Sequence, residues 1–380
     1  MKGSKEFLGL PRYCLAVASI LLVALGSAAA SYSYVDFNLT GMSGFSDSSG
    51  LGMSGMQQAG QALGPITGNN FHAVFWTGTG SSVVDLNPSG FTSTYAMGTS
   101  GNQQVGYGNG TITGNNNHAL LWSGSAGSIV DLNGSFTRTV ASGISGNKQV
   151  GSGSSTGNEH ALLWSGTASS VMDLNPLGFS TTSGSGIFGN QVVGSGYPTG
   201  GSSSHALMWA SGTPSSVVDL NPSFFTYSRA FGTSGSQQVG FGFSSATANS
   251  DHALVWSGTA SSAVDLNPTG FTFSDAYAVA GGRQVGVGYG PVTANNQHAL
   301  LWSGTASSVV DLQSVLSTNY LWSEAEGIDS NGNVIGAAYY VPTHTTHAIL
   351  WVVPEPNSFS FFALAALVFF RARFKSFAIR

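Results

Sequence analysis

With 380 residues, the chain could hold two ordinary domains or one large repeat array, so its length alone excludes little. Only 7% of the residues are Asp, Glu, Lys or Arg, whereas 42% are hydrophobic and 53 are glycine, which favours short strands and tight turns over long amphipathic helices. Between Asp36 and Glu355, fifteen acidic residues stand against four basic ones, a difference of −11 charges. Such a surface repels phosphate backbones and anionic lipid, which argues against binding of nucleic acid or of a membrane surface.

Residues 1–30 have the order of a cleaved signal peptide. Three basic residues precede an apolar run from Cys14 to Gly26, and Ala28, Ala29 and Ala30 follow it. The alternative, a membrane anchor, is disfavoured because this run is shorter than the roughly 20 residues that span a bilayer. We expect cleavage after Ala30, which removes the only cysteine and leaves the mature protein without a thiol, a disulfide or a cysteine metal ligand.

An internal repeat fills residues 31–352. Each copy has His-Ala, a Trp four residues after the His, a Val-rich run that ends in Asp-Leu-Asn or a close variant, and a later Gln-Val-Gly strand. The repeated residues are His72, His118, His160, His205, His252, His298 and His347; Trp76, Trp122, Trp164, Trp209, Trp256, Trp302 and Trp351; and Asp85, Asp131, Asp173, Asp219, Asp265 and Asp311. Successive histidines are 42 to 49 residues apart, which indicates one supersecondary unit per copy.

The copy that begins at His298 predicts four short strands, over residues 298–302, 309–312, 323–328 and 333–336. A turn with an Asn-Gly pair, residues 329–332, joins the last two strands as a hairpin. Four strands per copy match one blade of a β-propeller, whereas a one-rung coil of a β-solenoid would repeat at about half this length.

The predicted register makes both faces of each sheet largely apolar. If Trp302 pairs with Val309, then His298 lies diagonally across from Asp311 on one face, while Ala299 and other apolar residues occupy the opposite face. A sheet that is apolar on both faces must lie between two neighbours, so a single copy could not bury itself.

The two ends of the repeat region complement each other. Val35-Asp36-Phe37-Asn38 matches the Val-Asp-Leu-Asn strand, whereas the last copy stops at Trp351 and lacks that strand. Pairing the two ends would hide two sheet edges. We therefore predict an all-β fold, a seven-bladed β-propeller of four-stranded blades, closed by pairing of the N- and C-terminal strands. A β-solenoid adhesin is the alternative architecture.

Residues 353–380 carry a second signal. Val353, Pro354, Glu355 and Pro356 precede an apolar stretch over residues 359–370, and the basic residues Arg371, Arg373 and Lys375 follow it. This order resembles the PEP-CTERM sorting signal, which implies recognition by an exosortase-type membrane transpeptidase and removal of the tail. The basic end would hold the last residues on the cytoplasmic side of the membrane while the tail is uncleaved. The alternative is a transmembrane segment that is never processed.

The repeat itself resembles the extracellular HAF-type repeat. Residues 324–336, with Gly-Ile-Asp, an Asn-Gly turn and Val-Ile-Gly, followed by His-Ala and Trp, match it most closely, while earlier copies have Leu in place of Phe after His-Ala. The resemblance implies an exported, propeller-like protein of the Gram-negative envelope, secreted or held at the cell surface. It supplies no catalytic residues.

We interpret the repeated residues as structural. A site that is used once is not needed in every copy, so each His and Asp should form a hydrogen-bonded pair between strands, and each Trp should pack one blade against the next. A ring of metal ligands and a sugar-stacking platform are the alternatives. We predict no metal, no cofactor and no catalytic residue.

Residues that differ between copies are the other candidates. Glu324 and Glu326 stand two apart and could do acid/base work or bind calcium, although alternation on a solvated strand edge explains them equally well. His344 with His347 and the loop that starts at Asp329 superficially suggest metal sites, but both lack further ligands. Four aromatic residues after the Gln-Val-Gly strands could hold glycans in loops, or pack at strand edges: Tyr107, Phe241, Phe243 and Tyr289.

The sequence therefore predicts an exported structural or binding protein of the cell surface or extracellular matrix, not an enzyme, with an exosortase as transient partner and extracellular polysaccharide as a possible ligand. Membrane contact is expected only through the uncleaved tail. The rival function is a carbohydrate-active enzyme, a lyase or glycosidase, which would need non-repeated acid, Tyr and Arg residues at one mouth of the ring. Glu324, Glu326, Arg229 and Tyr227 are the residues that the sequence offers for it.

Overall fold

The computed structural model describes residues 32–155 and 157–353. Ser33–Val352 form one compact unit with its own buried core. The predicted signal peptide, residues 1–30, and the predicted sorting tail, residues 353–380 apart from Val353, lie outside the described residues.

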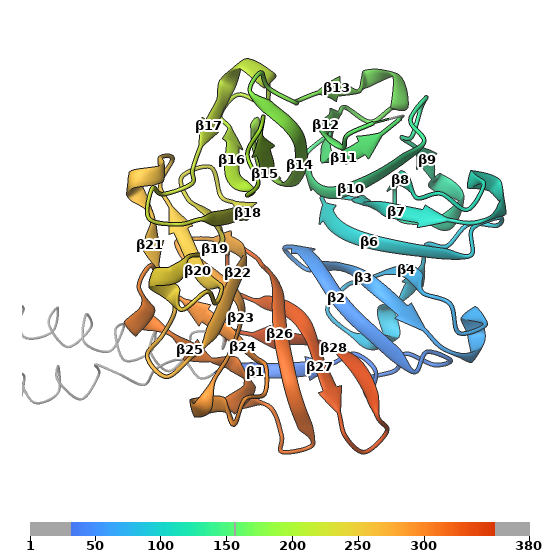
Figure 1. Cartoon of the computed structure of the whole chain (residues 1–380). Helices are drawn as coiled ribbons and strands as arrows, with labels where there is room; N and C mark the ends of the chain where they lie inside the picture. Colours follow the sequence, from blue (N-terminus) through green and yellow to red (C-terminus); the bar gives the residue numbers. More distant parts are fainter. Residues whose placement is uncertain (1–31, 156, 354–380) are drawn as a thin grey trace, which may run out of the picture. The chain divides into compact units, whose positions relative to one another are not determined.

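The described chain is a ring of seven four-stranded antiparallel sheets, each of which is one blade of a β-propeller (Figure 1). Blades 1 to 3 are β2 (Asp47–Ser54), β3 (Gln57–Leu63), β4 (His72–Trp76) and β5 (Val84–Asp85); β6 (Ser93–Ser100), β7 (Gln103–Asn109), β8 (His118–Trp122) and β9 (Val130–Asp131); and β10 (Arg138–Ser145), β11 (Lys148–Ser154), β12 (His160–Trp164) and β13 (Met172–Asp173). Blades 4 and 5 are β14 (Phe179–Phe188), β15 (Gln191–Pro198), β16 (His205–Trp209) and β17 (Val217–Asp219); and β18 (Tyr227–Thr233), β19 (Gln238–Phe243), β20 (His252–Trp256) and β21 (Val264–Asp265). Blades 6 and 7 are β22 (Phe273–Ala280), β23 (Arg283–Tyr289), β24 (His298–Trp302) and β25 (Val310–Asp311); and β26 (Tyr320–Ile328), β27 (Val334–Tyr340), β28 (Thr345–Val352) and β1 (Ser33–Asp36).

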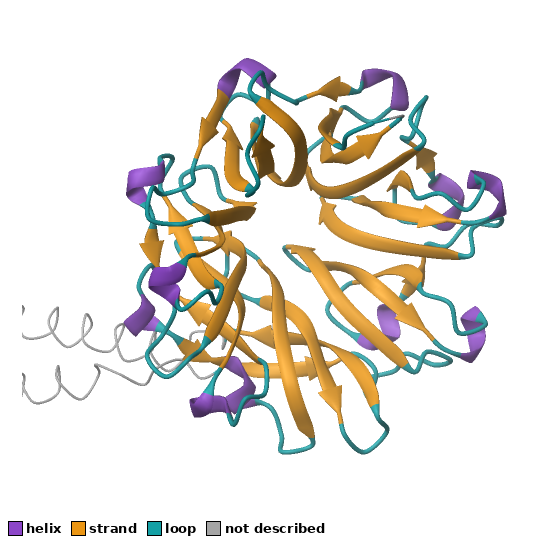
Figure 2. Ribbon diagram, viewed as in Figure 1, coloured by secondary structure: helices purple, strands orange, loops and turns teal. Residues whose placement is uncertain are grey.

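Short 3-10 turns join the strands, and most of them lie at the rim of the ring (Figure 2). Those between the second and third strands are η1 (Pro65–Thr67), η3 (Thr111–Thr113), η7 (Ser245–Thr247) and η9 (Pro291–Thr293). Those between the third and fourth strands are η2 (Gly80–Ser82), η4 (Ala126–Ser128), η5 (Ala168–Ser170), η6 (Pro214–Ser216), η8 (Ala260–Ser262) and η10 (Ala306–Ser308), and η11 (Leu312–Val315) follows β25.

The N-terminal strand closes the ring. β1 pairs antiparallel with β28, with Ser33 opposite Val352 and Asp36 opposite Ile349. The predicted seven-bladed propeller and its closure by the two terminal strands are therefore confirmed. The predicted strand register is also confirmed, because Leu300 pairs with Asp311 as the pairing of Trp302 with Val309 requires.

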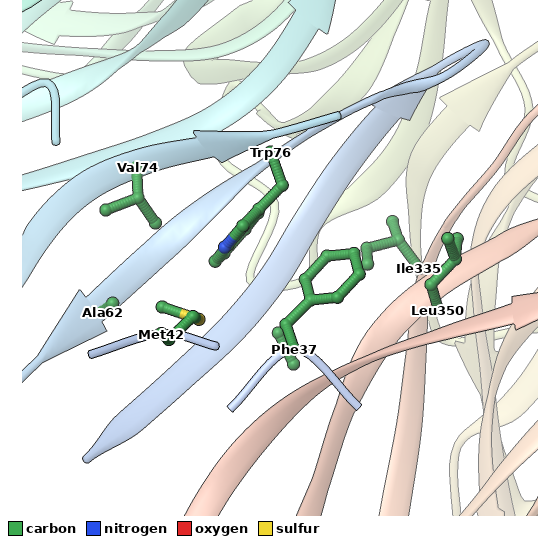
Figure 3. Close-up of a cluster of buried hydrophobic side chains, with 8 residues drawn as sticks. Phe37, Met42, Ala62, Val74, Trp76, Ile335 and Leu350 are labelled. Carbon is green, nitrogen blue, oxygen red and sulfur yellow. The ribbon is translucent and has the colours of Figure 1, made fainter. Parts of the chain in front are cut away.

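The seam between blades 7 and 1 is filled by a hydrophobic cluster (Figure 3). Phe37, which directly follows β1, contacts Trp76 of blade 1 with ring centroids 5.2 Å apart, and both side chains are fully buried. Ile335 of β27 and Leu350 of β28 complete the cluster from blade 7. The chain end thus contributes a core side chain as well as a strand, which ties the first residues of the ring to its last blade.

A polar contact also recurs at every junction between blades. In the first junction, Ala73 donates its backbone N–H to Thr94 Oγ1 of the next blade at 2.9 Å, and Thr94 donates to Asn87 Oδ1 at 2.8 Å. An Ala after the repeated His donates to a Ser or Thr of the next innermost strand in each of the other six junctions. These bonds satisfy backbone groups that the interface buries, as a packed interior requires.

Each innermost strand contains a β-bulge that turns one extra residue toward the centre of the ring. The bulge residues are Leu51, Met97, Ser142, Ser185, Phe231, Tyr277 and Glu326. Opposite the bulge stands the glycine of Gln-Val-Gly, and at Gly106 a Cβ would lie only 1.8 Å from the carbonyl oxygen of Tyr95. The close approach of the two strands at the bulge therefore explains why the repeat contains this glycine.

The seven bulge residues line a central channel with a cavity of 540 Å³. The innermost strands β2, β6, β10, β14, β18, β22 and β26 surround it (Figure 1). The channel is the place where all seven blades meet, so it is also where a difference between blades can create a single site.

Candidate functional site

The repeated histidines and aspartates form seven pairs inside the blades. Each His Nδ1 lies 2.6 to 2.8 Å from an Asp Oδ2, and the seventh pair joins His347 of β28 to Asp36 of β1. In the six ordinary blades the second oxygen of the Asp accepts the backbone N–H two residues later. Every pair is thus occupied by contacts within its own blade, which fits the structural interpretation.

The repeated Trp side chains are all fully buried. Trp122 packs with Leu86 of blade 1 and Leu120 of its own blade, and comparable clusters surround Trp164, Trp209, Trp256 and Trp302. None of these rings is exposed enough to stack on a sugar. The repeated Trp of each copy therefore supplies blade-to-blade packing.

Other candidates from the sequence also have partners inside the protein. His347 Nε2 lies 2.9 Å from Thr345 Oγ1, and His344 Nδ1 lies 3.2 Å from the hydroxyl of Tyr339. Asp329 accepts the backbone N–H of Asn331 and of Asn333 in a turn, both at 2.9 Å. Among the described residues, no group of three or more His, Cys, Asp or Glu side chains is arranged to hold a metal ion.

The four aromatic candidates lie in strands, which favours the alternative of packing at strand edges over glycan-holding loops. Three of them stack on an aromatic residue of the neighbouring innermost strand, at centroid distances of 4.8 to 5.2 Å: Tyr107 on Tyr95, Phe243 on Tyr227, and Tyr289 on Phe273. Phe241 contacts both Tyr227 and Phe231. Their stacking partners explain these positions as cross-strand pairs.

Among the described residues, the bulge position and the position two residues before it carry charged side chains in three adjacent blades only. Two residues before the bulge, blades 5, 6 and 7 carry Arg229, Asp275 and Glu324, whereas the same position in blades 1 to 4 holds Ser49, Tyr95, Val140 and Ser183. The bulge positions add Tyr277 in blade 6 and Glu326 in blade 7. Because the repeat does not require these residues, they form the candidate functional site.

We call Asp275, Glu324 and Glu326 the carboxyl cluster. Glu324 and Glu326 are partly buried and lie on β26, the innermost strand, which is also the edge strand of its sheet. Burial, and then the charges of Glu324 and Asp275, raise the pKa of Glu326 to about 8. Burial, and then Asp251, raise the pKa of Asp275 to about 7, against a lowering by the Tyr277 hydroxyl. Burial also raises the pKa of Glu324, whose Oε2 accepts a hydrogen bond from Gln297 at 3.2 Å.

Asp275 is only 7% exposed, and its Oδ1 has no hydrogen-bond partner. Its Oδ2 is 3.5 Å from the hydroxyl of Tyr277, at the limit of a hydrogen bond. Tyr277 in turn lies edge-on to Phe231, with ring centroids 5.6 Å apart. A buried carboxyl oxygen without a donor is costly, and such groups gather where proteins bind ligands or do chemistry.

Arg229 bounds the cluster on the side of blade 4. Its guanidinium lies over the ring of Tyr227, 5.4 Å from the centroid. It also lines a cavity of 300 Å³ together with Glu159 and Tyr197, and Glu159 forms an ion pair with Arg138. Burial raises the pKa of Asp251 while His252 and Arg229 lower it, so the basic group acts on this carboxylate at the boundary of the cluster.

The sequence singles out Glu324, Glu326, Arg229 and Tyr227, and the structure places the two glutamates on blade 7 and the other two residues on blade 5, with blade 6 between them. Asp275 and Tyr277 were not singled out. The signal was present, because aligning the strand before each Gln-Val-Gly places Asp275 in the same column as Glu324. Such a cluster can donate or accept protons near neutral pH, and it can bind a ligand that carries hydrogen-bond donors.

Within the described ranges, no helix has the length and apolarity that spanning a bilayer requires. The predicted transmembrane segment at residues 359–370 lies outside those ranges.

Comparison with known proteins relates the chain to other propellers by fold. No family model matches the sequence, and no curated protein matches it. The propeller domain of the Trilobed protease from Pyrococcus furiosus, which has an open velcro topology, matches with a TM-score of 0.52 and 10% identity over 82% of this chain and 96% of that chain. A puromycin hydrolase S511A mutant complexed with PGG matches with a TM-score of 0.54 and 11% identity over 85% of this chain. Prolyl endopeptidases match with a TM-score of 0.53 and 9% identity over 90% of this chain.

The present chain spans about half the length of the last two proteins, 56% and 54%, so only their propeller parts are matched. The prediction that the chain is not an enzyme is contradicted by these comparisons, because the propellers that match belong to peptidases. The physical reason for the error is that the repeated residues carry no catalytic motif, whereas residues that differ between blades can still form a single site. At 9 to 11% identity the likeness establishes the propeller fold and assigns no activity.

Proposed function

We propose that this protein is exported, is sorted to the cell surface or extracellular matrix, and binds a saccharide of that matrix beside its central channel. The observation that carries the binding proposal is the confinement of Arg229, Asp275, Tyr277, Glu324 and Glu326 to three adjacent blades of an otherwise repeated ring. Hydroxyl groups of Ser142, Ser185, Thr99 and Thr233 line the same channel and suit a hydroxyl-rich ligand.

Export and sorting rest on the two ends of the sequence, the signal-like residues 1–30 and the Val-Pro-Glu-Pro motif with its apolar and basic continuation. Intact-mass analysis of the protein from its native host should find a chain that starts near residue 31 and lacks the residues after about Pro356. Recovery of the full-length chain from membranes would refute the sorting proposal.

A glycan array with residues 31–352 tests the binding proposal. At least one class of glycan should bind, and Glu326→Gln should weaken that binding. Ser183→Ala is the matched control, because Ser183 occupies on blade 4 the position that Asp275 occupies on blade 6, and this change should leave binding intact. An array without any bound glycan would refute the proposal.

The carboxyl cluster also favours a second function, the hydrolysis of a glycosidic bond in the bound saccharide. A protonated Glu326 would donate its proton to the glycosidic oxygen as the bond to the anomeric carbon breaks, and a second carboxylate would take a proton from the attacking water. The raised pKa of Glu326 keeps a proton available near neutral pH. New reducing ends, released by the unmodified protein and absent with Glu326→Gln, would support hydrolysis; bound glycan recovered intact would exclude it.

A further inference from the structure

We infer that the carboxyl cluster binds the ammonium group of an amine-bearing saccharide, such as an oligomer of unacetylated glucosamine. This inference rests on the proposed saccharide binding and specifies the ligand of the same site. It follows from three features of the structure: an unpartnered buried oxygen, a local excess of negative groups, and an aromatic surface beside them.

The first feature is Asp275. Its side chain is more than nine-tenths buried, and Oδ1 has no donor within hydrogen-bond distance, while Oδ2 has only the distant hydroxyl of Tyr277. Oδ1 is buried and Asp275 does not line the channel cavity, so its carboxyl group has to turn toward the channel to meet a ligand. An N–H or O–H group of the ligand at Oδ1 would then remove the cost of this unpaired oxygen. A ligand group that only accepts hydrogen bonds, such as a phosphate or a sulfate ester, would leave Oδ1 unpaired.

The second feature is the charge around Asp275. Among the described residues, no Lys, Arg or His forms an ion pair with Asp275, Glu324 or Glu326; the ion pairs found are the seven His–Asp pairs and Arg138 with Glu159. The neutral amide of Gln297 is the donor found for Glu324. The three carboxyl groups therefore oppose one another's ionisation, and a cation placed among them would relieve that opposition.

The third feature distinguishes an organic ammonium from a metal ion. The described carboxylates do not converge in a group of three that would hold a metal. An ammonium group needs no fixed coordination geometry, because it offers three rotatable donors and can also lie against an aromatic ring. Tyr277 and Phe231 line the channel next to Glu326 and supply such rings.

The net charge of the region between the two terminal signals also favours a cationic ligand. An excess of eleven negative charges between Asp36 and Glu355 attracts a cationic oligosaccharide and repels a uronate or sulfated polymer. The hydroxyl-bearing lining of the channel suits the rest of a sugar ring, which favours an amino sugar over an aliphatic amine.

Calorimetry with residues 31–352 and three probes tests the inference at a slightly acidic pH, at which most amino groups of a glucosamine oligomer are protonated. A glucosamine hexamer should bind, and the fully N-acetylated hexamer, in which uncharged acetamido groups replace the ammonium groups, should bind at least about tenfold more weakly. Triglycine carries an amine on a peptide; if it binds as tightly as the glucosamine hexamer, the assignment to a saccharide is overturned.

Variants identify the residues responsible. Asp275→Asn should weaken binding of the glucosamine hexamer about tenfold or more, whereas Ser183→Ala should not change it. If Asp275→Asn does not fold, Glu326→Gln, which lies at the more open channel wall, replaces it with the same expectation.

The outcomes separate this inference from the proposed function. Equal affinity for the two hexamers, or unchanged affinity in Asp275→Asn and Glu326→Gln, overturns the ammonium site while saccharide binding stands. If neither hexamer binds but another glycan on the array does, the inference fails alone. If no glycan binds at all, both fail.

Discussion

The outer and inner strands of the blades differ in how many of their residues recur from one blade to the next. The third and fourth strands carry the same His, Trp and Asp side chains in blade after blade, and each of these makes the same contact. The innermost strands share a bulge between two small residues and a Ser or Thr toward the neighbouring blade, and a glycine of the second strand stands opposite. Packing therefore constrains the outer strands, and the channel-facing positions are free to differ, which is where a single site can arise.

A second comparison separates the seventh His–Asp pair from the other six. The side chains of His347 and Asp36 are 4% and 3% exposed, whereas those of His160 and Asp173 are 33% and 54% exposed. Asp36 also accepts hydrogen bonds from the Tyr320 hydroxyl and from the backbone N–H of Leu39. The same pair of residue types thus joins the two chain ends in blade 7 and lies partly exposed at the surface of the other six blades.

The largest effect is expected from deleting residues 31–41, which removes β1 and the core residue Phe37. Loss of a buried Phe alone costs about 3–5 kcal/mol, and the deletion also exposes the edge of β28 to pairing with other chains. Thermal unfolding should shift for the whole protein, and a synthetic peptide of residues 31–41 should restore part of the loss. An unchanged melting temperature would show that the seam does not hold the ring together.

The next effect is expected for His347→Ala, which leaves Asp36 buried without its imidazole partner. Leaving a buried polar group without a partner costs about 1–3 kcal/mol, and the remaining donors to Asp36 should keep the loss within that range. Denaturant unfolding measures this loss. A cost no greater than that of the exposed His160→Ala would show that burial at the seam adds nothing to the pair.

A smaller effect is expected from the pH dependence of stability, through the raised pKa values of Asp275 and Glu326, about 7 and about 8. The folded state holds these protons more tightly than the unfolded chain, so their contribution to stability is present below about pH 4 and is lost as the pH rises to about 8. The double variant Asp275→Asn with Glu326→Gln should therefore gain melting temperature relative to the unmodified protein at about pH 9. The gain should be a few degrees, since about 1 kcal/mol shifts a domain of this size by roughly 2 °C.

The control for this prediction is Ser183→Ala, which should show the same pH profile as the unmodified protein. A double variant whose melting temperature differs from that of the unmodified protein by the same amount at about pH 5 and about pH 9 would mean that the cluster titrates normally.

The fold could be predicted from the sequence because the repeated residues each have one clear structural role, as a turn, a strand or a packing contact. The Asn-Gly turn at residues 331–332, the alternation from His298 to Trp302 and the unmatched Asp36 together specified four strands, seven blades and the closing pair. The site was predicted only in part. Glu324 and Glu326 were visible, but the bulge that turns Glu326 into the channel depends on pairing with β27, and no local pattern reveals it.

Asp275 escaped the sequence analysis for a related reason. It stands between Ser274, which makes the repeated contact to Ala253, and Ala276, which is buried between blades, so it looks like one more polar residue in a Ser- and Ala-rich strand. Besides burial, the charge of Asp251, which precedes β20 on the neighbouring blade, raises the pKa of Asp275. Tertiary contacts, which a single sequence does not display, raise its pKa and leave its Oδ1 unpaired.

The smallest effect is expected for His160→Ala. This variant tests most directly whether the outer strands serve packing and the innermost strands serve binding. The His160–Asp173 pair is 2.7 Å long but partly exposed, so its removal should cost about 1 kcal/mol or less, which denaturant unfolding can resolve. Its blade lies outside the three blades that carry the charged channel residues, so ligand affinity should stay unchanged within error. Lost affinity at unchanged stability would assign the repeated histidines to binding, and the division between packing on the outer strands and chemistry on the inner ones would be wrong.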